Sequence, residues 1–192
     1  NKIDNIGRNV FADLPSLKTV NLDKNMIVNI FTSMWSLTIY EINLANNQIS
    51  VIDNNNGFSN LQNLQRLFLN NNKIEEFGKD GGLDNLDMLQ TIDVGYNLLT
   101  EFPYLSTTMP NLSQLTLDGN PILGLQFSGS AVYQKLVSLS ANNCLIQGMS
   151  GNFLTAFPVL QTFSIQSNNL TALPDFPSQS SNLTYINFGQ NG

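Results

Sequence analysis

The stretch Leu67-Phe68-Leu69-Asn70-Asn71-Asn72 is the clearest copy of a pattern that recurs along the chain. In each copy two apolar residues flank a variable one, two more variable residues follow, and the copy closes on Asn. The closing residues are Asn1, Asn25, Asn47, Asn72, Asn97, Asn120, Asn142, Asn168 and Asn191, which lie 22 to 26 residues apart. This period predicts a solenoid, because one unit of this length cannot bury its apolar face without its neighbours.

Apolar residues also occupy fixed positions within each repeat, at −8, −5, −3, +2 and +5 counted from the closing residue. The −5 column, for example, reads Val20, Ile42, Leu67, Ile92, Leu115, Val137, Phe163 and Ile186. The alternation around −5 and −3 has the period of two that β-strands show. We therefore predict a short strand in each repeat, paired in parallel with its neighbours, because the rest of the repeat is used in crossing back.

The closing Asn follows the predicted strand, where the chain bends inward. A side-chain amide offers two donors and an acceptor, and it can satisfy turn backbone groups that burial would otherwise leave unpaired. We therefore predict a structural role for Asn25, Asn47, Asn72, Asn97, Asn120, Asn142, Asn168 and Asn191.

The sixth repeat, counted from the one that closes on Asn25, departs from the pattern when it is aligned on Asn142. This alignment assigns three residues to the core columns −5, −3 and +2: Val137, Leu139 and Cys144. It also puts Gln134 at −8 and Gln147 at +5, where other repeats are apolar. We expect a local distortion or a longer loop between Leu125 and Leu139, and a buried, unreactive thiol at Cys144.

Composition excludes several classes of function. The 192 residues are 42% apolar with a mean hydropathy of −0.06, which is typical of a globular protein. A net charge of −6 argues against a nucleic-acid partner. With no histidine and one cysteine, the chain lacks His-based triads, His metal sites, an internal disulfide and multi-cysteine zinc motifs. We expect no catalytic residue, no metal and no cofactor, and hence no enzymatic activity.

The repeat L-x-x-L-x-L-x-x-N-x-I resembles the leucine-rich repeat family along the whole chain. Segments such as Ile3-Asp4-Asn5-Ile6, with Phe11 and Leu14-Pro15-Ser16-Leu17 after it, look like the class of about 24 residues found in Toll-like receptors and small leucine-rich proteoglycans. The resemblance implies an α/β solenoid, a horseshoe with a parallel sheet of about eight short strands on its concave face and irregular or short helical convex segments. We expect a single array over residues 1–192. Both ends fall in mid-repeat without caps, which suggests an internal fragment of a longer protein.

Residues at −6, −4 and −2 are predicted to project from the sheet, on the face that the family uses as its concave surface. Glu41 and Arg66 share a column in adjacent repeats, which indicates a surface ion pair. Phe68 is an aromatic residue on an otherwise polar face, and aromatic residues and Arg are enriched in binding hot spots. The candidate ligand-binding residues are Glu41, Arg66, Phe68, Asp93, Tyr96, Thr116 and Asp118. The alternative is a solvated face, with the ligand site on repeats outside this chain.

Asp93 and Asp118 lie diagonally on neighbouring predicted strands, about 7–8 Å apart by analogy with other sheets. This spacing overlaps that of inverting glycosidases. However, an open sheet face has no pocket to raise the pKa of an acid, and a calcium site would need further oxygen ligands. The pair therefore does not change the expectation of a protein without enzymatic activity.

Three N-glycosylation sequons begin at Asn111, Asn169 and Asn182, all at predicted strand margins. Together with the low content of charged residues they favour an extracellular or cell-surface location. The function that the resemblance implies is recognition of a protein or glycan ligand through the concave sheet, in a parent protein whose membrane anchor would lie outside this chain. Two alternatives remain open: a structural or adhesive matrix protein, and a cytoplasmic interaction scaffold, which a lone reduced cysteine would also suit.

Overall fold

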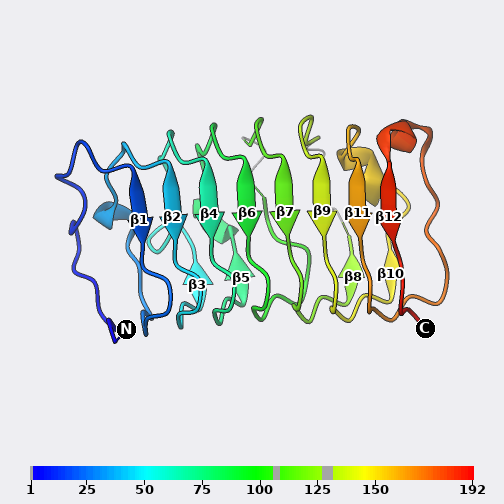
Figure 1. The fold of residues 1–192 in the computed structure, drawn as a ribbon, viewed down its shortest axis with the longest axis horizontal. Coiled ribbons are helices and arrows are strands. Elements are labelled where there is room, and N and C mark those ends of the chain that lie inside the picture. The colour runs from blue at the N-terminus through cyan, green and yellow to red at the C-terminus, as the bar shows by residue number, and fades with distance from the viewer. Residues whose placement is uncertain (1, 106–108, 127–131) are drawn as a thin grey trace.

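One parallel sheet runs through the whole molecule. The computed structural model describes residues 2–105, 109–126 and 132–192. Eight strands lie side by side in chain order (Figure 1). They are β1 (Thr19–Asn21), β2 (Glu41–Asn43), β4 (Arg66–Phe68), β6 (Thr91–Asp93), β7 (Gln114–Thr116), β9 (Ser138–Ser140), β11 (Thr162–Ser164) and β12 (Tyr185–Asn187). The eight parallel strands predicted from the repeat are therefore confirmed.

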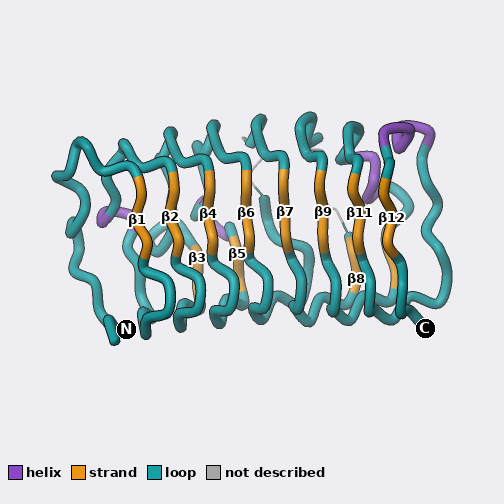
Figure 2. The backbone as a smooth tube through the Cα atoms, in the orientation of Figure 1, coloured by secondary structure: helices purple, strands orange, loops and turns teal. Residues whose placement is uncertain are grey.

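The return segments are mostly loop, as Figure 2 shows. In the described part of the chain the helical pieces are all short 3-10 helices: Thr32–Met34, Lys79–Gly81, Phe153–Ala156 and Ser178–Asn182. Four two-residue strands, which the sequence pattern did not predict, form two further small sheets. β3 (Val51–Ile52) pairs with β5 (Glu76–Phe77), and β8 (Gly124–Leu125) pairs with β10 (Gly148–Met149).

The core is a stack of apolar columns shared between repeats. Ile42, Leu67 and Ile92 at −5 are completely buried because each is covered by the repeats on both sides. At the C-terminal end of the sheet the same column becomes accessible, and Ile186 is 43% exposed. Burial in this fold is therefore supplied by the adjacent repeats rather than by the repeat itself.

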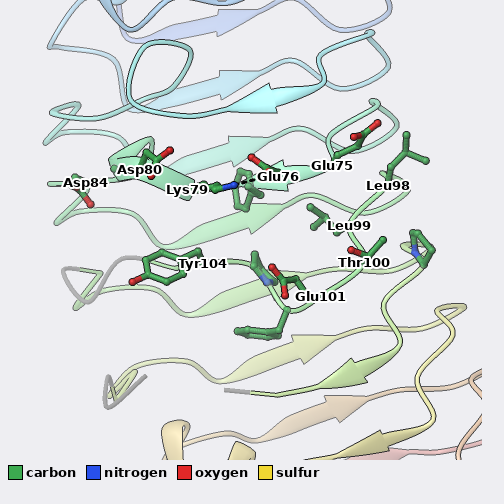
Figure 3. A pocket seen from close by; sticks show the side chains of 15 residues that line it. Glu75, Glu76, Lys79, Asp80, Asp84, Leu98, Leu99, Thr100, Glu101 and Tyr104 are labelled. Atoms are coloured by element: carbon green, nitrogen blue, oxygen red, sulfur yellow. Dashed lines mark hydrogen bonds and ion pairs between the residues drawn. The ribbon is translucent and has the colours of Figure 1, made fainter. Parts of the chain in front are cut away.

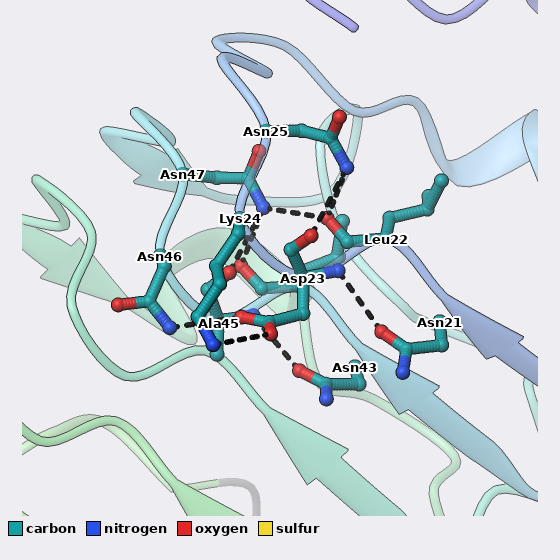
Figure 4. Close-up of polar contacts among 10 residues, drawn as sticks. Asn21, Leu22, Asp23, Lys24, Asn25, Asn43, Ala45, Asn46 and Asn47 are labelled. Atoms are coloured by element: carbon teal, nitrogen blue, oxygen red, sulfur yellow. Dashed lines mark hydrogen bonds and ion pairs between the residues drawn. The ribbon is translucent and has the colours of Figure 1, made fainter. Parts of the chain in front are cut away.

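The closing Asn residues form a hydrogen-bonded ladder between the repeats (Figure 4). The Nδ2 group of Asn47 donates to the carbonyls of Leu44 in its own repeat and Leu22 in the preceding repeat, both at 3.0 Å. Its Oδ1 accepts the N–H of Ile27 at 3.0 Å. The same pattern recurs at Asn72, Asn97, Asn120 and Asn168, all of which are buried. The structural role predicted for these side chains is confirmed, and Asn1 lies outside the described residues.

A left-handed residue precedes the closing position in every described repeat. The residues are Lys24, Asn46, Asn71, Tyr96, Gly119, Asn143, Ser167 and Gln190, with φ between 52° and 69°. This conformation is unfavourable for residues other than Gly, so the tight turn is held by the ladder around it. The left-handed residue is therefore an independent marker of where each repeat closes.

In the sixth repeat the closing residue is Cys144, and the prediction of Asn142 is wrong. Leu139 pairs with Leu115, which is a −5 residue, and the left-handed Asn143 comes directly before Cys144. The core positions −8, −3 and +2 are then filled by three buried residues: Leu136, Ala141 and Ile146. Asn142 is half-buried at −2 and belongs to the sheet face. If Asn142 closed the repeat, Gln134 and Gln147 would occupy core positions. A shift of the register by two residues puts apolar side chains in these positions instead.

Cys144 is buried as predicted, but it replaces an Asn of the ladder rather than a +2 core residue. Its Sγ lies 3.6 Å from the carbonyl oxygen of Leu117, the group that an Asn would contact. A thiol does not replace the amide oxygen, and the N–H of Ile122 bonds instead to the carbonyl of Asn120 at 2.8 Å. Burial raises the pKa of the Cys144 thiol to about 11. With this register Leu115 and Leu139 are a normal repeat length apart, so the sixth repeat does not require the longer loop that was predicted. Residues 127–131 lie outside the described part.

Candidate functional site

Four adjacent strands bring the predicted ligand-binding residues onto one surface. Glu41 of β2 is the register partner of Arg66 of β4. Asp93 of β6 pairs with Phe68 on one side and with Thr116 of β7 on the other. We call the surface formed by Glu41, Arg66, Phe68, Asp93, Tyr96 and Thr116 the recognition face. The −2 position contributes less than predicted, because Ala45 and Gly95 are buried.

Arg66 is held in place by two neighbours. Its Nε donates to Oε2 of Glu41 at 2.6 Å, and its Nη2 contacts the same oxygen. The guanidinium carbon also lies 5.7 Å from the centre of the Tyr40 ring. An exposed ion pair adds only about 0–1 kcal/mol to stability, so its main effect is to fix the direction of the Arg66 side chain. The ion pair predicted from the shared column is confirmed.

Phe68 lies half-buried in the centre of this surface, between Asn43 of β2 and Asp93 of β6. Its position is determined by the alternation of β4, in which Leu67 points into the core and the residues on either side point outward. Arg66 precedes it by two places on the same face. The recognition face therefore combines an apolar centre with a positive and a negative neighbour.

Asp93 and Asp118 have different environments. Burial raises the pKa of the Asp93 carboxyl, the N–H of Gly95 partly offsets this effect, and the charge of Asp118 raises the pKa further. The Oδ1 atom of Asp118 accepts hydrogen bonds from Ser140 Oγ at 2.6 Å and from the N–H of Asn142 at 2.8 Å. Asp118 is thus engaged by the following repeat, whereas Asp93 bonds within its own.

Tyr96 stands at the margin of the recognition face and is 55% exposed. It adopts the left-handed conformation, with φ of 53°, and its N–H donates to the carbonyl of Asp118 at 2.5 Å. Its ring lies against the next repeat at Gly119, where a Cβ atom would come within 2.5 Å of the ring. Glycine at position 119 therefore makes room for the Tyr96 ring.

Two of the three sequon asparagines have a structural role as well. Asn111 donates to the carbonyl of Asp87 at 2.7 Å, and Asn182 donates to that of Pro158 at 2.9 Å. Asn63 occupies the same −9 column, is not part of a sequon, and makes the equivalent bond to Leu37 at 2.9 Å. Asparagine at −9 is thus explained by the bond between repeats, whereas Asn169 is exposed just after its ladder residue.

A cavity that the repeat pattern did not predict is lined by none of the residues of the recognition face. Figure 3 shows the side chains that line it. The cavity has a volume of about 920 Å³ and is lined by parts of segments 75–84 and 98–104 and by Pro121. The one feature of the sequence that could have indicated this cavity is Pro103, which interrupts the series of short flanking strands. Among the described residues there is no cluster of three or more Asp, Glu, Cys or His suited to a metal ion. No helix in the described ranges is long and apolar enough to cross a membrane.

Comparison with known proteins identifies the fold. No family model matches the chain, and no curated protein matches it. Among solved structures it is similar to a chain of the Toll–Spatzle complex of Drosophila, with 17% identity and a TM-score of 0.74 over 98% of this chain and 29% of that one. It is also similar to a chain of the octameric complex of Latrophilin 3, Unc5D and FLRT2, with 22% identity and a TM-score of 0.79 over 95% of this chain and 57% of that one.

The chain therefore has the leucine-rich repeat fold, a horseshoe solenoid with a parallel eight-stranded sheet. It spans 29% and 57% of the length of these two neighbours.

Proposed function

We propose that the chain is an extracellular protein-recognition module that binds its ligand through the recognition face, with a glycan as the alternative ligand. The observation that carries this proposal is the position of Phe68, which has Arg66 two residues before it on β4 and Asp93 beside it on β6. Aromatic and Arg side chains supply most of the binding energy at protein interfaces, where they are surrounded by polar contacts.

The geometry of Arg66 supports this proposal. A side chain that is already oriented loses less conformational entropy on binding than a free one. Glu41 and Tyr40 orient the guanidinium without covering it, since the Arg66 side chain remains 48% exposed. A ligand carboxylate would find a guanidinium whose remaining N–H groups face solvent.

The fold neighbours support a protein ligand. One of them is described in complex with Spatzle, and the other in an assembly that contains Latrophilin 3 and Unc5D. Both complexes join a leucine-rich repeat protein to protein partners. By analogy, we propose a protein rather than a small molecule as the ligand of this chain.

We also propose that the chain is not an enzyme. A pair of catalytic carboxylates needs one group that is free to donate a proton and a site that excludes water. Asp118 already accepts hydrogen bonds from Ser140 and Asn142, and it lies on the sheet face with Asp93. This arrangement suits positioning of the neighbouring repeat rather than proton transfer.

Binding to intact cells tests the proposed recognition face. Fluorescently labelled wild-type chain should bind saturably, and the Arg66→Ala plus Phe68→Ala variant should lose at least about tenfold in affinity, because two hot-spot truncations of about 1 kcal/mol or more each are removed together. The matched control is Leu37→Ala plus Leu173→Ala, which changes two exposed apolar residues away from the recognition face. Equal binding of all three proteins would contradict the proposal. Loss in the control alone would favour an adhesive role of the flanks.

The proposed location has a separate test. Treatment of the protein from its native source with an N-glycosidase should lower its mass, and Asn169 is the sequon residue best placed to carry a glycan. An unchanged mass would favour the cytoplasmic scaffold.

A further inference from the structure

The cavity of about 920 Å³ lies where the two small flanking sheets are separated. In each small sheet the N–H at +6 donates to the carbonyl at +5 of the preceding repeat: Gly78 to Ile52 at 3.3 Å, and Ser150 to Leu125 at 2.9 Å. The residue at +6 between these two sheets is Pro103, which has no N–H. The carbonyl of Phe77 therefore receives no such bond, and the ladder is broken at β5.

Part of the cavity lining is apolar. Leu99 and Phe102 are buried at its base. Leu98 and Tyr104 stand at its rim and are 44% and 73% exposed. Exposed side chains of this size, adjoining a cavity, indicate a surface that is suited to a partner.

The rim is strongly acidic. Five carboxylates line the cavity, and the single cationic side chain is that of Lys79. Lys79 is paired with Glu76 at 2.8 Å, and hydrogen bonding to Glu76, with the charges of Glu76, Asp80 and Glu101, raises the pKa of its ammonium group. None of the other four carboxylates forms an ion pair with a residue that the structure describes. They are Glu75, Asp80, Asp84 and Glu101.

An apolar strip continues from the cavity along the same flank. Leu98, Pro121 and Leu145 occupy the position after the closing residue in three consecutive repeats. Leu145 is exposed, as is Leu123 beside Pro121 in the sequence. The accessible apolar surface is therefore extended in the direction in which the repeats stack.

We propose that this cavity binds an extended segment of a partner protein in which Lys or Arg side chains alternate with apolar ones. Alternate side chains of an extended segment point to opposite sides, so one set would contact Leu98 and Tyr104 while the other met the carboxylates. The carbonyl of Phe77, to which Pro103 cannot donate, is an acceptor for a backbone N–H of the segment. The charge of the cavity, five carboxylates against one ammonium, selects a basic partner over an acidic one.

This site is separate from the recognition face and does not depend on the proposed function. The cavity is formed by the flanking segments, whereas the recognition face is formed by β2, β4, β6 and β7. Variants in one leave the residues of the other unchanged, so the two proposals fail independently.

The test is fluorescence anisotropy with two fluorescein-labelled peptides, KLKLKL and ELELEL. The wild-type chain should bind KLKLKL, with an affinity that falls as salt is added, and should bind ELELEL at least tenfold more weakly. The Asp80→Asn plus Glu101→Gln variant should weaken KLKLKL binding by roughly 2- to 25-fold, since each exposed ion pair accounts for a factor of roughly 1.5 to 5. Leu98→Ser plus Tyr104→Ser should weaken it as well.

The matched control is Asp13→Asn plus Asp87→Asn, which removes the same charge from exposed positions outside the cavity. It should bind KLKLKL as wild type does, and all variants should show the melting temperature of the wild type. An equal loss of affinity in the control would overturn the proposal, because it would mean that the peptide is attracted by net charge alone. Equal binding of the two peptides by wild type would overturn it as well, because it would mean that the cavity does not select a basic segment.

Discussion

The recognition face at Asp93 and the adjoining sixth and seventh repeats bond the backbone N–H at −2 to different partners. In the repeat that contains Asp93, the side chain at −4 accepts the N–H at −2 of its own repeat, from Gly95 at 3.0 Å. Asn43 does the same for Ala45. In the sixth and seventh repeats the −4 residues are Ser140 and Ser164, and the acceptor comes instead from the preceding repeat. Asp118 accepts from Asn142, and Asn142 from Gln166.

This difference separates the surface to which we assign ligand binding from a surface whose side chains bond to the neighbouring repeats. We call the linked group of Asp118, Ser140, Asn142, Ser164 and Gln166 the polar network. Asn142 is its centre, because its amide contacts Asp118, Ser140, Ser164 and the N–H of Gln166. Side chains of the polar network have partners in the next repeat, whereas Phe68 and Tyr96 present apolar surface that a ligand can cover.

The largest expected effect comes from removing the centre of the polar network. Asn142→Ala should lower the free energy of unfolding by about 2–3 kcal/mol, because it leaves several half-buried groups without partners. Asn43→Ala, which removes one local bond, should cost about 1 kcal/mol. The measurement is the midpoint of urea unfolding for both variants. Equal losses would mean that the two surfaces are held in the same way.

A second expected effect on stability concerns the sixth repeat, which contains Asn142 of the polar network. Cys144→Asn should raise the free energy of unfolding by roughly 1 kcal/mol, because an amide at the closing position can donate a full hydrogen bond to the carbonyl of Leu117, which the thiol contacts only at 3.6 Å. The measurement is again urea unfolding. A loss of several kcal/mol would show instead that residue 144 sits in an apolar core column.

The smallest effect is a pH dependence on the recognition face. Burial raises the pKa of Asp93 in the folded state, so its protonated form is favoured by folding. Its contribution to stability is therefore lost as pH rises from the unfolded pKa, near 4, through the folded pKa. Asp93→Asn keeps an acceptor for Gly95 and should remove this decline, so that the variant melts at a higher temperature than wild type at pH 7. Melting temperatures between pH 3 and 7 provide the check, and parallel curves for the two proteins would argue against a buried charge at Asp93.

Much of the fold could be predicted from the sequence, because the repeated pattern of apolar residues and Asn determines it. Eight strands, their parallel pairing and the ladder role of Asn47 follow from columns that recur in every repeat. The register of the sixth repeat was not, because both Asn142 and Cys144 can close a repeat and the more common residue type is the wrong one. The apolar residue at −8 was the better guide, since Leu136 is buried and Gln134 is exposed.

The candidate site also has features that the sequence predicts and features that it does not. The pairing of Glu41 with Arg66 follows from a shared column and could be predicted. The bonds of Asp118 could not, because they depend on which side chain of the next repeat reaches back to it. The cavity depends on one missing N–H at Pro103 and on the side chains around it, which the repeat pattern leaves variable.

Photo-crosslinking on intact cells tests most directly the claim that recognition belongs to Phe68 and its neighbours rather than to the polar network. A benzophenone-bearing residue would replace Phe68 in one protein and, in the other, Ser138, which lies on the same face of β9 two residues before Ser140 of the polar network. We predict a discrete crosslinked partner from position 68, competed by unlabelled wild-type chain, and no such product from position 138. A competed product from position 138 with none from position 68 would contradict it.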